Sequence, residues 1–233
     1  MQARDRLVVA ADLSSRDEIL RLVEELRGAA GVIKIGLQAF VANGPAIVRE
    51  IVAGGEKVFL DLKIHDIPNT AEHAVTEATE LGASIITVHA SGGASMLRAC
   101  SKTSALVLGV TILTSLDDAE VDGIGYRGNA MESAVRLAAL AQSSGLRGVV
   151  ASPHEIVAIR KACGDRFVIL TPGIRPAGEA AGDQRRTMTP SEAMRAGADY
   201  IVVGRPITNA KSRREAALRI IDEMSTSLTS AGG

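Results

Sequence analysis

The chain has almost no aromatic side chains: Phe, Tyr and Trp together make up 2% of its 233 residues, and tryptophan is absent. Proteins that bind single-stranded nucleic acid stack the bases on aromatic side chains, so the sequence disfavours this class of function. A net charge of −1 with dispersed basic residues argues the same way, because polyanions are bound by basic patches. We therefore expect no nucleic-acid polymer among the partners of this protein.

Long apolar runs and cysteines are also scarce. No segment approaches the roughly 20 apolar residues that a membrane-spanning helix requires, so we expect no membrane partner. The segment Met1–Arg6 carries mixed charge and leads directly into a short apolar strand, unlike a secretion signal. The two cysteines, Cys100 and Cys163, lack metal-ligand spacing and are expected to be reduced structural residues. Together these features predict a cytoplasmic protein.

What the chain does contain is a regular alternation of two kinds of segment. Short runs rich in β-branched residues are separated by segments in which apolar residues recur at helical spacing. The predicted strands are 7–10, 32–35, 58–60, 84–88, 106–110, 148–151, 167–170 and 200–203. Eight strand–helix units of roughly 29 residues each, with both strand faces apolar, favour a closed (β/α)8 TIM barrel of the α/β class over a doubly wound open sheet.

The sequence shows no linker that would divide the barrel into domains. We therefore expect a single (β/α)8 barrel domain over residues 1–225. The last residues, 226–233, are rich in Ser, Thr and Gly and predict a disordered C-terminal tail.

Charged side chains are concentrated directly after the third predicted strand. Asp61, Lys63 and Asp66 follow the apolar run 58–60 within six residues. Residues two apart on a strand share a face, so Asp61 and Lys63 are expected to point the same way. Charges at the buried end of a strand lose hydration unless they are paired, which predicts compensating charges nearby.

Such charges are found at the carboxyl ends of the other predicted strands, where TIM barrels carry their chemistry. Read strand by strand, this rim consists of Asp12, Lys34, Asp61 with Lys63, His89, Thr114, Ser152, Arg175, and Gly204 with Arg205. An alternating chain of acids and bases is expected there, formed by Lys34, Asp61, Lys63 and Asp66. A purely structural ion-pair cluster is less favoured, because buried ion pairs stabilise little compared with apolar substitutes.

The end of the eighth predicted strand has a phosphate-binding pattern. Gly204 opens a short helix whose backbone N–H groups favour an anion, and Arg205 can add a bidentate contact. The irregular segment from Pro172 to Thr189 contributes Arg175 and Gln184 and has the length of a functional lid. A glycine that only makes a turn is the alternative, but the combination predicts a phosphorylated small substrate.

Two other patterns in the sequence do not indicate a dinucleotide or a metal site. The segment Gly123–Gly128 matches G-x-G-x-x-G, but it follows an acidic loop instead of a strand, which disfavours a dinucleotide site. The four histidines lack metal-ligand spacing, so no metal site is expected. His89 at a strand end either lines the pocket or is a packed, hydrogen-bonded imidazole, and the second reading is favoured.

These motifs resemble those of the bacterial orotidine 5′-phosphate decarboxylase family. The block DLKIHDIPNT at residues 61–70 is similar to the family signature. Further similar blocks follow the family's order: AD at 11–12, VIKIG at 32–36, TVHA at 87–90, LTS at 113–115, PGIRP at 172–176, DQRR at 183–186 and VGRPI at 203–207. The resemblance runs from about Leu7 to Met224. The acidic stretch from Asp117 to Gly128 matches no family motif.

The resemblance implies an enzyme that converts orotidine 5′-monophosphate to uridine 5′-monophosphate (UMP), the last step of de novo pyrimidine biosynthesis, without metal or organic cofactor. In this reading Lys63 stabilises the carbanion left on C6 of the pyrimidine and then donates the proton, while Asp61 sits against the departing carboxylate. Lys34 orients Asp61 and, with Asp12, holds the ribose hydroxyls.

The resemblance also implies the remaining contacts. Asp66 would complete the catalytic set, and Asp66 and Thr70 would reach into the partner subunit's site, so the expected assembly is a homodimer. The implied substrate contacts beyond the charged chain are Ile67, Thr70, Thr114, Pro172, Arg175, Gln184, Gly204 and Arg205, with Thr114 at the pyrimidine and the last four at the phosphate and lid.

Two other functions stay open from the residues alone. The first is a metal-dependent sugar-phosphate decarboxylase or aldolase on the same barrel; such relatives carry a carboxylate for magnesium where this chain has Lys34, which disfavours it. The second is a non-catalytic sensor or scaffold that binds a phosphorylated ligand, which would require the rim charges to be incidental.

Overall fold

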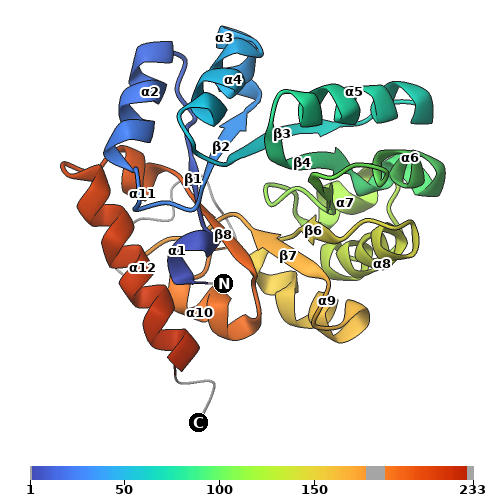
Figure 1. Cartoon of the computed structure of the whole chain (residues 1–233). Coiled ribbons are helices and arrows are strands. Elements are labelled where there is room, and N and C mark those ends of the chain that lie inside the picture. Colours follow the sequence, from blue (N-terminus) through green and yellow to red (C-terminus); the bar gives the residue numbers. More distant parts are fainter. Residues whose placement is uncertain (1, 177–186, 230–233) are drawn as a thin grey trace.

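The eight predicted strands form one closed parallel barrel in the order β1 to β8, with β8 paired to β1 (Figure 1). The structure is a computed structural model that describes residues 2–176 and 187–229. The strands are β1 (Leu7–Ala10), β2 (Val32–Gly36), β3 (Val58–Ile64), β4 (Ala83–His89), β5 (Leu106–Val110), β6 (Gly148–Val150), β7 (Val168–Thr171) and β8 (Tyr200–Val203). The predicted (β/α)8 barrel is confirmed.

Helices connect the successive strands and surround the barrel (Figure 1). They are α1 (Ala3–Arg6), α2 (Arg16–Glu25), α3 (Leu37–Asn43), α4 (Ala46–Ala53), α5 (Pro68–Glu80), η1 (Ala90–Gly92), α6 (Gly93–Cys100), α7 (Asp118–Gly123), α8 (Ala130–Ser143), η2 (Pro153–Glu155), α9 (Ile156–Cys163), α10 (Pro190–Ala196), α11 (Arg205–Thr208) and α12 (Arg213–Thr229). The last of these, α12, contacts α10, α11 and α1. Within the described ranges, no helix is both long and apolar enough to cross a membrane.

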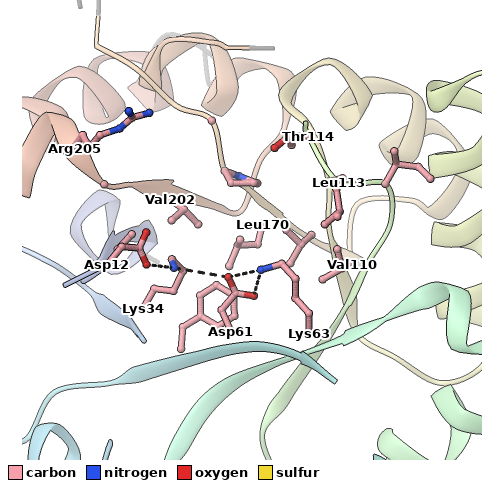
Figure 2. Close-up of a pocket in the computed structure, with 18 of the residues that line it drawn as sticks. Asp12, Lys34, Asp61, Lys63, Val110, Leu113, Thr114, Leu170, Val202 and Arg205 are labelled. Atoms are coloured by element: carbon pink, nitrogen blue, oxygen red, sulfur yellow. Dashed lines mark hydrogen bonds and ion pairs between the residues drawn. The ribbon is translucent and has the colours of Figure 1, made fainter. Parts of the chain in front are cut away.

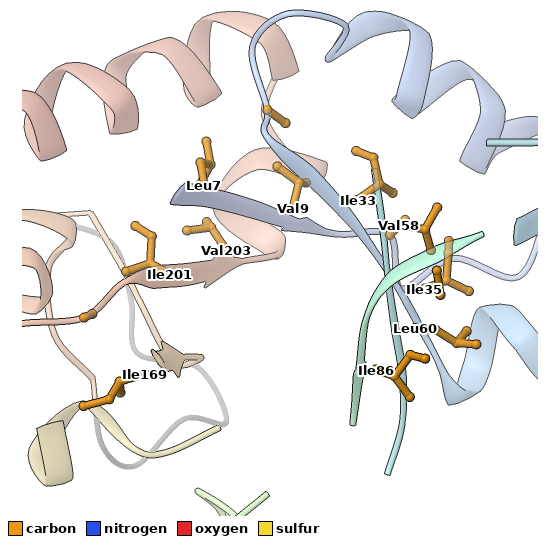
Figure 3. Packing of buried hydrophobic residues seen from close by; sticks show 14 of the residues in the cluster. Leu7, Val9, Ile33, Ile35, Val58, Leu60, Ile86, Ile169, Ile201 and Val203 are labelled. Carbon is orange, nitrogen blue, oxygen red and sulfur yellow. The ribbon is translucent and has the colours of Figure 1, made fainter. Parts of the chain in front are cut away.

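Alternation along the strands separates two apolar layers. One set of side chains fills the inside of the barrel: Val8, Ala10, Val32, Phe59, Ile85, Leu108, Leu170 and Val202. The neighbouring residues point outward and pack under the helices, and Figure 3 shows members of this layer on β1, β2, β3, β4, β7 and β8. Because successive side chains of a strand lie on opposite faces, both faces of every strand are apolar, as the sequence pattern predicted.

The third strand departs from the predicted boundaries. The predicted apolar run covers only residues 58–60, whereas the strand continues through the charged residues to Ile64, and its register with β4 shifts between Leu60 and Ile64. Within this irregular stretch Lys63 has a φ of 53°, the only positive φ of a non-glycine residue in the described part of the chain. This left-handed conformation is unfavourable for a residue with a Cβ by about 1–2 kcal/mol. The strand therefore bends where its charged residues begin.

The two cysteines are free thiols and both are buried. Burial raises the pKa of Cys100 to about 11 and also raises the pKa of Cys163. A thiol reacts as its thiolate, so neither residue is activated as a nucleophile. This environment agrees with the structural role that was predicted for them.

The C-terminal region differs from the predicted tail. Helix α12 continues to Thr229, so helix extends into the segment 226–233 that was expected to be disordered. Ser225 and Thr226 each donate a side-chain hydrogen bond to a backbone carbonyl one turn earlier, which is compatible with helix. Residues 230–233 lie outside the described residues, and the division of the chain at residue 225 stays a prediction.

Candidate active site

A pocket of about 300 Å³ opens at the carboxyl ends of the strands (Figure 2). Its floor and walls include inner-barrel side chains such as Phe59, Leu170 and Val202. The predicted rim residues that line it are Asp12, Lys34, Asp61, Lys63, Thr114, Pro172, Arg175, Gly204 and Arg205. The structure thus brings together nine predicted positions from six strand ends.

The period of the strands explains how the charged side chains reach this pocket. On β2, Val32 points into the barrel core, and Lys34 lies two residues further along the same face. On β3, Phe59 occupies the core, and Asp61 and Lys63 follow at the same spacing. The inner face of β2 and that of β3 therefore change from apolar to charged as these strands leave the core.

The charged groups form one alternating row, Asp12–Lys34–Asp61–Lys63, drawn with dashed lines in Figure 2. Lys34 Nζ lies 2.8 Å from Asp12 Oδ1 and 3.8 Å from Asp61 Oδ2. Lys63 Nζ lies 2.9 Å from both carboxylate oxygens of Asp61. The Asp61 carboxylate therefore has an ammonium group on each side.

Burial makes this row more than a surface ion-pair network. The side chains of Lys34 and Asp61 are only 11% and 13% exposed, whereas Lys63 is 30% exposed and faces the pocket. Charges shielded from water interact more strongly than exposed ones, so the two buried members are held tightly. Of the two lysines beside Asp61, Lys63 is therefore the one that is more accessible to a ligand.

Gly36 leaves the space that this row occupies. A Cβ atom at this position would lie 2.8 Å from Lys34 Nζ and 3.1 Å from Asp12 Oδ1. Any larger residue would displace the ammonium group of Lys34 from between the two carboxylates. The glycine at the end of VIKIG is thus required by close approach of side chains, since its own φ of −93° suits any residue.

Asp66 does not take part in the row, so the expected chain of Lys34, Asp61, Lys63 and Asp66 is wrong in its last member. Strand β3 ends at Ile64 and the chain turns outward into α5, which leaves Asp66 exposed. Its Oδ1 accepts a hydrogen bond from the backbone N–H of Ile67 at 2.7 Å. Asp12, at the other end, supplies the second carboxylate of the row.

Ile67 and Thr70 likewise lie away from the pocket of their own chain. Both are exposed, and the Ile67 side chain is 67% accessible although it is apolar. Together with Asp66 they form one exposed turn at the start of α5. The structure therefore does not bring these three predicted positions to the site.

Two further residues of the predicted rim do not line the pocket. Ser152 is fully buried after β6. His89 packs its ring against that of His65, with 5.3 Å between centroids and a tilt of 36°. Of the two readings left open for His89, the packed imidazole agrees with this contact. Burial lowers the pKa of His89 below its ordinary value of 6.5, and the charges of His65 and Lys63 lower it further.

The lowered pKa of His89 predicts a loss of stability on acidification. Unfolded chains bind a proton at His89 near pH 6.5, whereas the folded protein resists protonation until the pH is lower. The free energy of unfolding should therefore fall as the pH drops through 6.5 toward the folded-state value, and this part of the decrease should vanish in His89→Gln. Urea unfolding of both proteins between about pH 8 and about pH 5 measures the difference. Parallel pH dependence in the two proteins would contradict this prediction.

The segment predicted as a lid is described only at its ends. Ile174 and Met188 form an isolated bridge, and the backbone N–H of Arg175 donates to the carbonyl of Met188 at 2.9 Å. The predicted contact Gln184 lies in 177–186, outside the described residues. In the described part of the chain, no group of three or more His, Cys, Asp or Glu side chains is placed to hold a metal ion.

Sequence reasoning missed one residue at the centre of the site. Thr87 on β4 donates its hydroxyl hydrogen bond to Asp61 Oδ1 at 2.9 Å and accepts one from the backbone N–H of Lys63 at 3.0 Å. The TVHA block was noted as a motif, but no role was given to its threonine. The available signal was the strand period, because Thr87 lies two residues beyond Ile85 of the inner core.

Comparisons with known proteins agree with the geometry. A family model described as the orotidine 5′-phosphate decarboxylase / HUMPS family matches residues 5–220. Proteins named orotidine 5′-phosphate decarboxylase from Heliobacterium modesticaldum and Moorella thermoacetica are 49% and 46% identical, covering 98% and 96% of this chain and 99% and 94% of their own lengths. The solved structure of orotidine 5′-phosphate decarboxylase from Lactobacillus acidophilus matches with a TM-score of 0.84 and 33% identity, covering 94% of this chain and 98% of that one.

Proposed function

The chain belongs to the orotidine 5′-phosphate decarboxylase family, and on this premise we propose how its rim residues carry out the reaction. The enzyme converts orotidine 5′-monophosphate to UMP in pyrimidine biosynthesis. The observation that carries the proposed mechanism is the position of Lys63 Nζ, 2.9 Å from both oxygens of Asp61 at the pocket surface.

Lys63 acts on the electron pair that the departing carbon dioxide leaves behind. That pair occupies an in-plane orbital on C6 of the pyrimidine, where the ring offers no conventional electron sink. An ammonium group fixed beside C6 stabilises the developing negative charge without reorganising, and it then donates a proton to give UMP. Lys63 suits both tasks because Asp61 already holds its ammonium group in place.

Asp61 acts on the carboxylate of the substrate. Two unit charges about 4 Å apart at an effective dielectric constant near 20 interact by roughly 4 kcal/mol. A substrate carboxylate beside Asp61 would be repelled by about this amount, and the repulsion would weaken as neutral carbon dioxide forms. We assign the larger share of catalysis to Lys63, because its attraction grows in the transition state.

Lys34 and Asp12 position both the substrate and the reacting pair. Lys34 is close to Asp12 and Asp61 at once, so it orients Asp61 while its ammonium group remains near the pocket. Asp12 is 54% exposed and can accept hydrogen bonds from ribose hydroxyls. The sugar would thus lie over the Asp12–Lys34 end of the row and the pyrimidine over the Asp61–Lys63 end.

The phosphate binds at the opposite edge of the pocket. Arg175, Gly204 and Arg205 line this edge, and Figure 2 shows Arg205 on the far side of Val202 and Leu170 from Lys63. Thr114 contacts the pyrimidine and Pro172 borders the substrate. The family resemblance assigns Gln184, which lies outside the described residues, to the phosphate. Binding energy gained at a remote phosphate can serve to orient the substrate and to close the site over the reacting carbon.

The functional unit is a homodimer in which Asp66, Ile67 and Thr70 reach the partner subunit's site. Their exposure on one turn at the start of α5, outside the pocket of their own chain, supports this assignment. The enzyme works in the cytoplasm.

The reaction needs no metal or organic cofactor in this proposal, and one assay tests it. Protein treated with a chelator and dialysed should still consume orotidine 5′-monophosphate, followed by ultraviolet absorbance, at the rate of untreated protein. A strict requirement for magnesium would instead favour a metal-dependent sugar-phosphate decarboxylase or aldolase. Tight nucleotide binding without turnover would favour a sensor.

A further inference from the structure

The hydroxyl group of Thr87 connects the two residues at the centre of the proposed mechanism. It lies 2.9 Å from Asp61 Oδ1 and 3.0 Å from the backbone nitrogen of Lys63. Thr87 is fully buried on the inner face of β4, beside β3. It therefore contacts Asp61 and Lys63 from inside the protein and does not line the substrate pocket.

The direction of both hydrogen bonds is determined by the chemistry of the groups. A backbone N–H can only donate, so the Thr87 oxygen accepts from Lys63. The hydroxyl has one proton, and that proton is then directed to the carboxylate of Asp61. The Thr87 hydroxyl thus accepts one hydrogen bond and donates another at the same time. A serine side chain can do both, and a valine side chain can do neither.

The Lys63 backbone is unusual at this point. Lys63 has a φ of 53°, and the register of β3 with β4 is shifted between Leu60 and Ile64. The N–H of Lys63 bonds a side chain of β4 where a regular strand would bond its backbone. Strained conformations of this kind persist where surrounding contacts over-determine them, and they concentrate at functional sites.

We propose that Thr87 is a positioning residue for the decarboxylation. Its hydroxyl group holds the Lys63 backbone in the left-handed conformation and aims the Asp61 carboxylate, so that the ammonium and the carboxylate keep one relative geometry. This inference rests on the proposed roles of Lys63 and Asp61. Because those groups act most strongly in the transition state, losing their alignment should lower kcat and leave substrate binding nearly unchanged.

The test compares Thr87→Val, which removes the hydroxyl at nearly constant shape, with Thr87→Ser, which retains it. Losing a hydrogen bond to a charged group is expected to lower kcat about 10- to 100-fold in Thr87→Val, with KM and UMP affinity changed less than about threefold. Thr87→Ser should keep kcat within about fivefold of wild type, since serine is freer than threonine to rotate but can form both bonds. Thr87→Ala against Thr87→Ser gives the same comparison if the valine variant does not fold.

Thr111→Val is the matched control for loss of a buried hydroxyl. Thr111 is also buried at the end of an adjacent strand, and its hydroxyl donates to the carbonyl of Val150 at 3.1 Å, away from the charged row. We expect this variant to lower the unfolding midpoint about as much as Thr87→Val and to keep wild-type kcat. Equal kcat in the two valine variants, or an equal loss in Thr87→Ser and Thr87→Ala, would overturn the role of Thr87.

Lys63→Ala, assayed in parallel, separates this inference from the function on which it rests. If Lys63→Ala is inactive and Thr87→Val has wild-type kcat, only the positioning role is overturned. If Lys63→Ala keeps full activity, the proposed mechanism fails and the role of Thr87 fails with it.

Discussion

Replacing Lys63 by alanine should abolish decarboxylation while nucleotide binding remains measurable. The variant loses both the ammonium group that stabilises the C6 carbanion and the acid that protonates it. Electrostatic stabilisation and general acid catalysis multiply, so kcat is expected to fall about 10⁴-fold or more. UMP should still bind, because Asp12, Lys34 and the arginine edge of the pocket are unchanged.

Absorbance assays with orotidine 5′-monophosphate measure the loss, and calorimetric titration with UMP measures binding. The matched control is Lys57→Ala. Lys57 is exposed and immediately precedes β3 at the opposite end of the same strand, so its removal should leave kcat at the wild-type value. Turnover at the wild-type rate in Lys63→Ala would exclude the mechanism.

Two inactive variants should regain activity when they are mixed. If Asp66 completes the partner's site, a heterodimer of a Lys63→Ala chain and an Asp66→Ala chain contains one intact site, built from Lys63 of the second chain and Asp66 of the first. Its other site lacks both residues. Random exchange between twofold-symmetric dimers makes half of the dimers mixed, so about one quarter of wild-type activity is expected.

The experiment mixes the two variants under conditions that exchange subunits and then measures turnover against each variant alone. An equal mixture of Lys63→Ala with wild type is the control, and it should retain about half of the wild-type sites. No gain on mixing the two inactive variants, with subunit exchange established separately by native mass spectrometry of differently tagged chains, would show that Asp66 does not act across subunits.

The barrel could be predicted because its strands are short apolar runs bounded by clear changes of composition. The end of β3 could be predicted only approximately: the apolar run stops at Leu60, Asp61 and Lys63 were expected to share a strand face, and the strand ends at Ile64. Pairing of Asp61 with Gly36 of β2 continues the strand beyond Leu60, an effect of tertiary contacts that local composition does not report. Helix α12 is a second element whose end local composition did not predict. It packs on α10 and continues as helix into a Ser- and Thr-rich sequence.

The charged row could be predicted in part because strand ends meet at one rim. Asp12, Lys34, Asp61 and Lys63 were all found this way. Asp66 was misplaced because its position depends on where β3 ends. Nothing in the sequence predicted the left-handed backbone of Lys63, because glycine or asparagine indicates such a conformation and lysine does not.

The charged row has a consequence for how substrate enters and product leaves. Its two carboxylates and two ammonium groups sum to zero, so the row exerts little attraction on an anion that is still in solution. Under the proposed assignment, capture of the nucleotide from a distance depends on Arg175 and Arg205 at the other edge of the pocket. Once Lys63 has given its proton to C6, the row carries a net charge of −1 until Lys63 is protonated again, so it does not attract the anionic product. The charged row therefore does not hold UMP by electrostatic attraction, and the residence time of the product is governed by the contacts of its phosphate.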